Sequence, residues 1–261
     1  MEACRDESVF DWIAKGREPF VVRKTDEPWP GCKVRNLIPD VFESYAKVLH
    51  RIEAKYAYVD NLLSPEEERI MRIPQNSPLR TLILERRESA EAGYTRLRWK
   101  QLAEVLGIPF AAGITWNWFR ALERDLDWPR YLFGPGEGYL EEEEYKELAG
   151  LLERRSSSHC YYRLAEIPYI ATDQWLLFRG STEEVCTIPV QRSWNAPEYW
   201  WSAELEWCVC SDYDLNFTIV AGPHSLIAGV LASTILEAIE AQPDLRLDDF
   251  TPIPDQVDDA E

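Results

Sequence analysis

The run from Pro197 to Ala221 constrains the fold of this chain more than any other segment. In an extended strand, every second side chain lies on the same face. The residues from 207 to 212 therefore divide between two faces, with Trp207, Val209 and Ser211 on one and Cys208, Cys210 and Asp212 on the other. Residues 212–216 supply turn formers, and a second β-prone run follows them. We therefore expect a β-hairpin at the centre of a sheet.

Hydrophobic spacing and punctuation predict the other elements. Apolar residues at helical spacing predict helices over 39–49, 98–106, 116–126 and 225–240. Gly107 stands where the second of these would end in a left-handed cap. Four carboxylates, Glu141 to Glu144, are expected to begin a further helix because they complement its dipole. With strands over 159–163 and 175–179, this pattern predicts an α+β fold with flanking helices and a mostly antiparallel central sheet.

The domain organisation follows from length and composition. A chain of 261 residues can form one large domain, and we expect a single α+β domain over residues 1–245. The polar stretch near 61–95 is interrupted by prolines and is predicted to be a peripheral insertion. The acidic, proline-containing segment 246–261 is expected to be a C-terminal tail.

Charge bears on the class of partner. The formal net charge is −18, from 28 basic and 46 acidic residues. A negative field repels phosphate backbones, so nucleic-acid binding is disfavoured and a basic partner is favoured. No apolar run approaches the length of a membrane span, and the N-terminal segment does not have the layout of a signal peptide, so we expect a cytoplasmic protein without a membrane partner. The six scattered cysteines are expected to be reduced.

The sequence predicts no catalytic residue. A cysteine or serine nucleophile needs a base beside it, and three histidines could serve. His50 is expected at a helix end and His224 just before a helix, where capping roles are simpler. His159 adjoins Cys160, but neighbours in a strand point to opposite faces.

The sequence offers candidate ligand residues but predicts no metal site. Cys208 and Cys210 share a strand face, yet the second pair of ligands that a closed site needs is missing, so we expect buried thiols, no metal and no cofactor. Asp212 and Asp214 could bind a cation or act as acid and base, although turn formation is simpler. Arg179 could hold a carboxylate or phosphate group.

Several blocks of the chain resemble an uncharacterised family of bacterial hypothetical proteins. The blocks are FESYAKVLH at 42–50, RW at 98–99, LFRG at 177–180 and YWWSAELEWCVCSDYDLNFTIVAG at 199–222. The family carries similar FxxYAxVLH, RW, LxRG and WWPxxRxWCVxTxxDxxxTxVGG blocks. This chain departs from it at Ser202-Ala203, where a proline is usual, and at Ala221-Gly222, where two glycines are usual. The resemblance implies no activity.

A second resemblance covers about nine residues. The segment LIPDVFESY at 37–45 is similar to the opening of SUKH-superfamily domains. That resemblance implies an aromatic-bearing helix after the proline and a small α+β sheet. It also implies an immunity protein that neutralises a bacterial toxin.

Together these observations favour a binding protein. Our leading hypothesis is a bacterial protein-binding module, of the immunity type, whose acidic rim and aromatic anchors hold a basic partner. Its expected binding residues are Trp200, Trp201, Arg179, Asp212 and Asp214. The alternatives are a small-molecule hydrolase or transferase, with a site around Arg179, Asp212, Asp214 and His224, and a structural or housekeeping protein. An exposed apolar patch at the two tryptophans would favour binding, and a pocket joining Asp212 to His224 would favour an enzyme.

Overall fold

The computed structural model describes residues 2–20, 31–55, 82, 94–120, 132–155, 159–164, 177–187, 197–248 and 251–253. The chain falls into two compact units. The first unit comprises residues 1–50 and 136–248, and the second comprises residues 51–135 and 249–261. The predicted insertion near 61–95 lies almost wholly outside the described residues.

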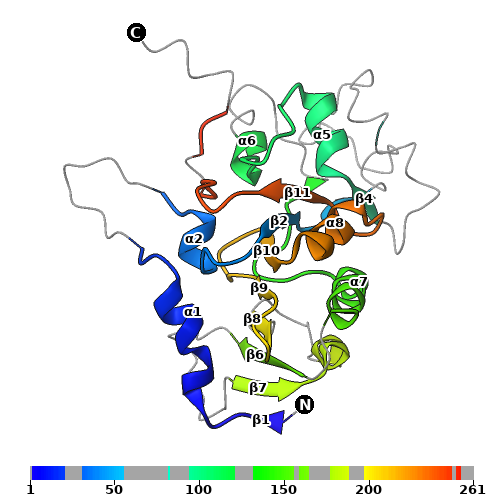
Figure 1. Cartoon of the computed structure of the whole chain (residues 1–261). Coiled ribbons are helices and arrows are strands. Elements are labelled where there is room, and N and C mark those ends of the chain that lie inside the picture. Colours follow the sequence, from blue (N-terminus) through cyan, green and yellow to red (C-terminus); the bar gives the residue numbers. More distant parts are fainter. Residues whose placement is uncertain are drawn as a thin grey trace, which may run out of the picture. The chain divides into compact units, whose positions relative to one another are not determined.

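The first unit is built on an eight-stranded antiparallel sheet (Figure 1). Its strands, in order across the sheet, are β1 (Glu2–Ala3), β7 (Leu177–Gly180), β6 (Cys160–Leu164), β8 (Pro197–Ser202), β9 (Cys208–Cys210), β10 (Phe217–Gly222), β2 (Ser44–Leu49) and β11 (Ala238–Ala241). β9 and β10 form the expected central hairpin, with Cys210 opposite Ile219. The predicted α+β fold with a mostly antiparallel sheet is confirmed.

Helices cover both faces of this sheet, as Figure 1 shows for α1 and α7. One face packs against α7 (Glu142–Glu153), the 3-10 helix η5 (Thr182–Thr187) and α8 (His224–Ala232). The other face lies against the N-terminal elements, which are η1 (Glu7–Phe10), α1 (Asp11–Gly16) and α2 (Val34–Leu37). Because side chains alternate along a strand, neighbouring residues pack on opposite faces of the sheet. Trp207 and Val209 join the core beneath α7, whereas Tyr199 and Trp201 contact the ring of Phe10 at 5.2 and 5.6 Å between centroids.

The acidic run at residues 141–144 begins α7, as predicted. The backbone N–H of Glu141 donates to the carboxylate of Glu144 at 3.2 Å. The three carboxylates in the first turn lie where the helix dipole favours negative charge. This run is therefore a helix start.

Residues 44–49 form strand β2, so the predicted helix over 39–49 is wrong. The strand lies between β10 and β11, and both of its faces are buried. A strand buried on both faces is almost continuously apolar, and such a run satisfies helical spacing as well as strand alternation. Pro39 instead precedes a turn, and its carbonyl accepts from the hydroxyl of Tyr45 at 3.0 Å. The segment that resembled the opening of SUKH domains therefore leads into a strand.

The predicted helix over 225–240 is correct only in its first half. α8 ends at Ala232, and β11 occupies the second half at the end of the sheet order. Ser233 ends the helix in an extended conformation, and its hydroxyl accepts from the backbone N–H groups of Ile235 and Leu236, both at 3.2 Å. Serine side chains compete with helices through such local hydrogen bonds. The apolar pattern therefore continues past the point at which the helix stops.

In its described residues, the second unit contains a three-stranded antiparallel sheet and the helices α5 and α6. Its strands, in order, are β4 (Tyr94–Leu97), β3 (Ile52–Lys55) and β5 (Leu132–Phe133). α5 (Trp99–Leu106) ends at Gly107 with φ of 69°, which confirms the predicted left-handed cap. α6 (Trp116–Arg120) confirms the start of the helix predicted over 116–126, and the rest of that range lies outside the described residues.

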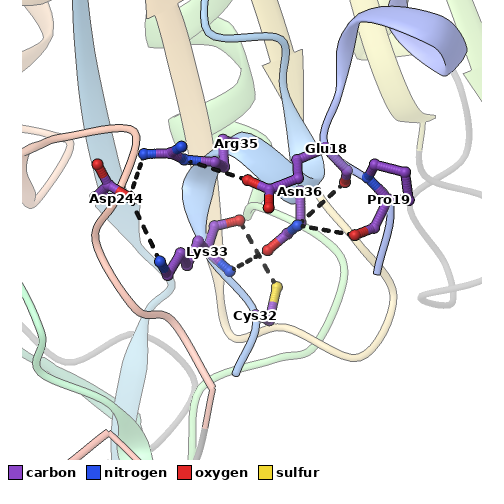
Figure 2. Close-up of polar contacts among 7 residues, drawn as sticks. All are labelled: Glu18, Pro19, Cys32, Lys33, Arg35, Asn36 and Asp244. Atoms are coloured by element: carbon purple, nitrogen blue, oxygen red, sulfur yellow. Dashed lines mark hydrogen bonds and ion pairs between the residues drawn. The ribbon is translucent and has the colours of Figure 1, made fainter. Parts of the chain in front are cut away.

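Polar contacts join α2 to two distant segments of the first unit (Figure 2). The Asn36 side chain accepts from the backbone N–H of Lys33 at 2.7 Å and donates to the Glu18 carbonyl at 3.1 Å. Arg35 pairs with the carboxylates of Glu18 and Asp244, and Lys33 also pairs with Asp244. These four charged residues, Glu18, Lys33, Arg35 and Asp244, are referred to as the α2 ion-pair cluster.

The first residues of the expected C-terminal tail are packed in the first unit. Leu247 is buried, and its backbone N–H donates to the Cys32 carbonyl at 2.7 Å. Asp248 accepts from the backbone N–H of Cys32 at 2.8 Å and pairs with Arg246. Residues 246–248 are therefore part of the fold.

Candidate functional site

Trp200 and Trp201 are core residues, so the exposed apolar patch that would have favoured binding is not found at them. Both side chains are 0% exposed. Adjacent residues of a strand point to opposite faces, and β8 lies inside a sheet that is covered on both faces. Trp200 therefore packs near Tyr145 of α7, and Trp201 stacks on Tyr161 with 5.6 Å between ring centroids. Neither can anchor a partner in this structure.

Asp212 and Asp214 lie in the turn between β9 and β10. The backbone N–H of Asp214 donates to the Asp212 carboxylate at 3.0 Å, and the backbone N–H of Leu215 donates to the Asp212 carbonyl at 3.0 Å. The predicted turn-forming role is confirmed. Burial raises the pKa of Asp212, whereas the Asp214 side chain is exposed.

Tyr213, between these two aspartates, presents an aromatic ring at the surface. Its side chain is 39% exposed. The charge of Asp214 raises the pKa of Tyr213, and partial burial, Asp212 and Glu198 act in the same direction. Glu198 is close because its carbonyl accepts from the backbone N–H at the start of this turn, on Ser211, at 2.8 Å. We call Glu198, Asp212, Tyr213 and Asp214 the acidic turn.

A glycine fixes the backbone of the acidic turn. The N–H of Gly138 donates to the Leu215 carbonyl at 2.8 Å. Gly138 has φ of +73°, and a Cβ at this position would lie 2.6 Å from the Cα of Tyr213. Any other residue would clash with the turn and adopt a conformation that side chains disfavour. The loop before α7 and the acidic turn are therefore in direct backbone contact.

A buried chain of hydrogen bonds lies beneath the same turn. Nδ1 of His50 is 2.7 Å from the Gly136 carbonyl, which can only accept, so this nitrogen carries the proton. Nε2 then accepts from the hydroxyl of Thr218 at 2.9 Å, and Thr218 accepts from Ser211 at 2.7 Å. The three side chains are buried, and burial lowers the pKa of His50 to about 4. A neutral, fully bonded network therefore supports the acidic turn from inside.

This arrangement suits the binding of a cation at the surface. Aromatic faces attract lysine and arginine side chains, and carboxylates around the ring add charge-assisted hydrogen bonds. Arg17 offsets part of the negative charge at Asp212 and donates to the Tyr199 hydroxyl at 2.9 Å. Asp214 and the ring of Tyr213 remain exposed.

Arg179 does not join the acidic turn. It lies on β7, and the sheet order places two strands between β7 and β9. Neighbouring strands are about 4.8 Å apart, so at least about 14 Å separates it from β9. Its guanidinium donates to Nδ1 of His159 at 3.2 Å, and burial and this charge together lower the pKa of His159.

His224 lies at the opposite end of β10 from Asp212. The strand runs from Phe217 to Gly222, and five residue steps span about 17 Å. His224 instead begins α8, where its backbone N–H donates to the Glu43 carboxylate at 3.1 Å. The described residues therefore do not form the Asp212–His224 pair that the hydrolase or transferase hypothesis required.

A buried lysine on β2 was not expected from the sequence. Lys47 is 0% exposed, and its Nζ lies 4.4 Å from the centre of the Phe217 ring. Burial lowers its pKa to about 7. A charged residue inside an apolar run was the available signal, because lysine side chains are rarely buried completely.

In the described part of the chain, the cysteines form no disulfide and no cluster of side chains forms a metal site. All six cysteines are unpaired, and burial raises the pKa of both Cys208 and Cys210. Among the described residues, no group of three or more histidine, cysteine, aspartate or glutamate side chains could hold a metal ion. No described helix has the length and apolar character that crossing a membrane requires.

Comparison with known proteins adds no family to this description. No family model, no curated protein and no solved structure matches the chain. Both resemblances noted in the sequence therefore stay predictions.

Proposed function

We propose that this protein binds a basic protein partner through the acidic turn. The observation that carries the proposal is the ring of Tyr213, which is 39% exposed and stands between Asp212 and the exposed Asp214. The third carboxylate of the acidic turn, on Glu198, pairs with Arg163 at 3.4 Å. Tyrosine is enriched at protein interfaces because it offers apolar area and a hydroxyl at a small entropic cost. The anchor is thus Tyr213 in place of the two tryptophans.

Rigidity of the turn supports the same proposal. The backbone of the acidic turn is held by Gly138 from one side and by the chain of Ser211, Thr218 and His50 from inside. A binding element that is already ordered loses little conformational entropy when the complex forms. The net charge of −18 would further speed the encounter with a positively charged molecule.

Capture of a partner from the native host tests the proposal. The immobilised protein is incubated with host extract at low salt, and the retained proteins are identified by mass spectrometry. We expect at least one basic protein, which is lost when Asp212→Asn and Asp214→Asn are combined. Asparagine keeps the side-chain oxygen that forms the turn and removes the charge.

A matched control removes two charges elsewhere. Glu153→Gln and Glu183→Gln neutralise two exposed carboxylates of α7 and η5 and should leave capture unchanged. If no basic protein is retained, or if both double variants lose it equally, the acidic turn is not the binding site.

An immunity-type inhibitor of a basic toxin is the particular form of this proposal that the sequence suggested. The negative net charge supports this form. The resemblance to SUKH domains does not add support, because residues 44–49 form a strand where it implied a helix. A captured partner that is toxic to the host when the present protein is deleted would support this form.

A further inference from the structure

The turn between β8 and β9 exposes a leucine in an unfavourable backbone conformation. Leu205 has φ of 60°, and no other described residue except glycine has a positive φ. The left-handed region is disfavoured for residues with a Cβ and is especially rare for leucine. The side chain is also 47% exposed, so its packing offers limited compensation.

The core imposes this conformation. The backbone N–H of Leu205 donates to the Ser202 carbonyl at 3.0 Å. The buried hydroxyl of Ser202 accepts from the N–H groups of Glu206 and Trp207, at 2.7 and 3.4 Å. These bonds fix the turn whatever residue occupies position 205. Asparagine or glycine would fit its backbone better, so folding does not explain the leucine.

The surroundings of Leu205 combine apolar surface with negative charge. Glu204 and Glu206 flank it, and both are exposed. The segment before β2 ends at the same end of the sheet, because Ser44 pairs with Gly222 and the Glu206 carbonyl lies 3.3 Å from where a Cβ of Gly222 would be. That segment exposes Val41, at 71%, between further carboxylates on Asp40 and Glu43.

We propose that Leu205 is an apolar anchor for a partner protein whose apolar pocket is bordered by lysine or arginine side chains. Charge complementarity selects this occupant, since residues 39–43 and 203–206 contain four carboxylates and no lysine or arginine. They outnumber the charge of Arg179, which acts together with Glu204 on His159 beside this turn. The surface lies at the opposite end of the central strands from the acidic turn, so it is a second binding surface.

The first test separates backbone strain from side-chain contact. Leu205→Asn relieves the strain and should raise the Tm by about 2 °C, whereas Leu205→Ala keeps the strain and should change it by less than about 1 °C. If Leu205→Asn instead lowers the Tm, the leucine stabilises the fold and the proposal is wrong.

The second test measures binding at residue resolution. The protein carries labelled leucine methyl groups and tyrosine rings and is titrated, by NMR, with an amphipathic peptide of leucine and lysine. The methyl signals of Leu205 should shift to saturation. Combining Glu204→Gln with Glu206→Gln should weaken this binding about fivefold, because two rim charges are lost.

A peptide in which glutamate replaces lysine is the control and should leave the signals unshifted. Equal shifts with both peptides, or no shift of Leu205 with either, would overturn the proposal. The Tyr213 ring signals report on the acidic turn separately, so failure of one surface is distinguishable from failure of the other.

Discussion

The buried hydrogen-bond chain beneath the acidic turn and the α2 ion-pair cluster are both polar, but they differ in exposure. Ser211, Thr218 and His50 are buried and neutral. In the ion-pair cluster, the Asp244 side chain is 69% exposed and that of Lys33 is 37% exposed. Exposed ion pairs contribute roughly 0–1 kcal/mol, whereas leaving a buried polar group without its partner costs about 1–3 kcal/mol. Sensitivity to substitution should therefore concentrate beneath the turn.

The largest expected effect comes from Gly138→Ala. The new methyl group would clash with the backbone of Tyr213, and the residue would keep a positive φ. We expect a loss of about 2–5 kcal/mol in the free energy of unfolding, measured by urea denaturation.

Gly107→Ala is the matched control for this substitution. Gly107 has a similar φ of +69°, but nothing lies within 4 Å of the position that a Cβ would take. Gly107→Ala should lower the free energy of unfolding by only about 1–2 kcal/mol, from backbone strain. Equal losses at the two glycines would contradict the contact between Gly138 and the acidic turn.

The buried histidine should make stability depend on pH. The pKa of His50 is about 4 in the folded protein and about 6.5 in the unfolded chain, so the unfolded state binds the proton more readily. The contribution of His50 is complete above pH 6.5 and is lost as the pH falls toward 4, by about 3 kcal/mol in all. Denaturation of wild type and His50→Gln across this window measures the difference. Identical pH profiles would show that the histidine is not buried in its neutral form.

Thr218→Val should have an intermediate effect. It removes the hydroxyl that joins His50 to Ser211 while keeping the shape of the side chain. His50 and Ser211 would each lose a hydrogen-bond partner, and we expect the free energy of unfolding to fall by about 1–3 kcal/mol. Thr218→Ser retains the hydroxyl and should lose only about 1 kcal/mol, for the missing methyl group. If the valine variant were as stable as the serine variant, the hydrogen bonds of Thr218 would not contribute to stability.

Asp244→Asn should have the smallest effect. It breaks the pairs with Arg35 and Lys33, which lie at the surface (Figure 2). We expect a loss below about 1 kcal/mol that shrinks further at high salt. A loss as large as that of Thr218→Val would show that exposure does not distinguish the two regions.

The hairpin was predictable from the sequence because its information is local. Alternation from Trp207 and the turn formers at 212–216 specify two neighbouring strands without reference to the rest of the chain. The end of α8 is also determined locally, by the hydrogen bonds that the Ser233 hydroxyl accepts from Ile235 and Leu236. The spacing of apolar residues does not reveal such bonds.

The supporting network and the burial of the tryptophans depend on distant parts of the chain. His50 and Thr218 are 168 residues apart and meet only because β2 pairs with β10. Trp200 and Trp201 are both buried because helices cover both faces of β8, and no pattern within 197–202 reveals that. Tyr213 lay inside the predicted turn, but a turn residue's exposure depends on what packs around it.

The most direct test of the central claim is the kinetics of complex formation with the captured basic partner, measured on a biosensor for wild type and Tyr213→Ala. Leu231→Ala, on α8, is the control because it also removes a partly exposed apolar side chain. We expect Tyr213→Ala to raise the dissociation rate at least about tenfold, since an aromatic anchor contributes about 2 kcal/mol or more, while the association rate changes little. We also expect salt to slow association, because the Debye length falls from about 10 Å at 0.1 M to about 3 Å at 1 M. Rates for Tyr213→Ala equal to those of wild type and of Leu231→Ala would contradict binding through the acidic turn.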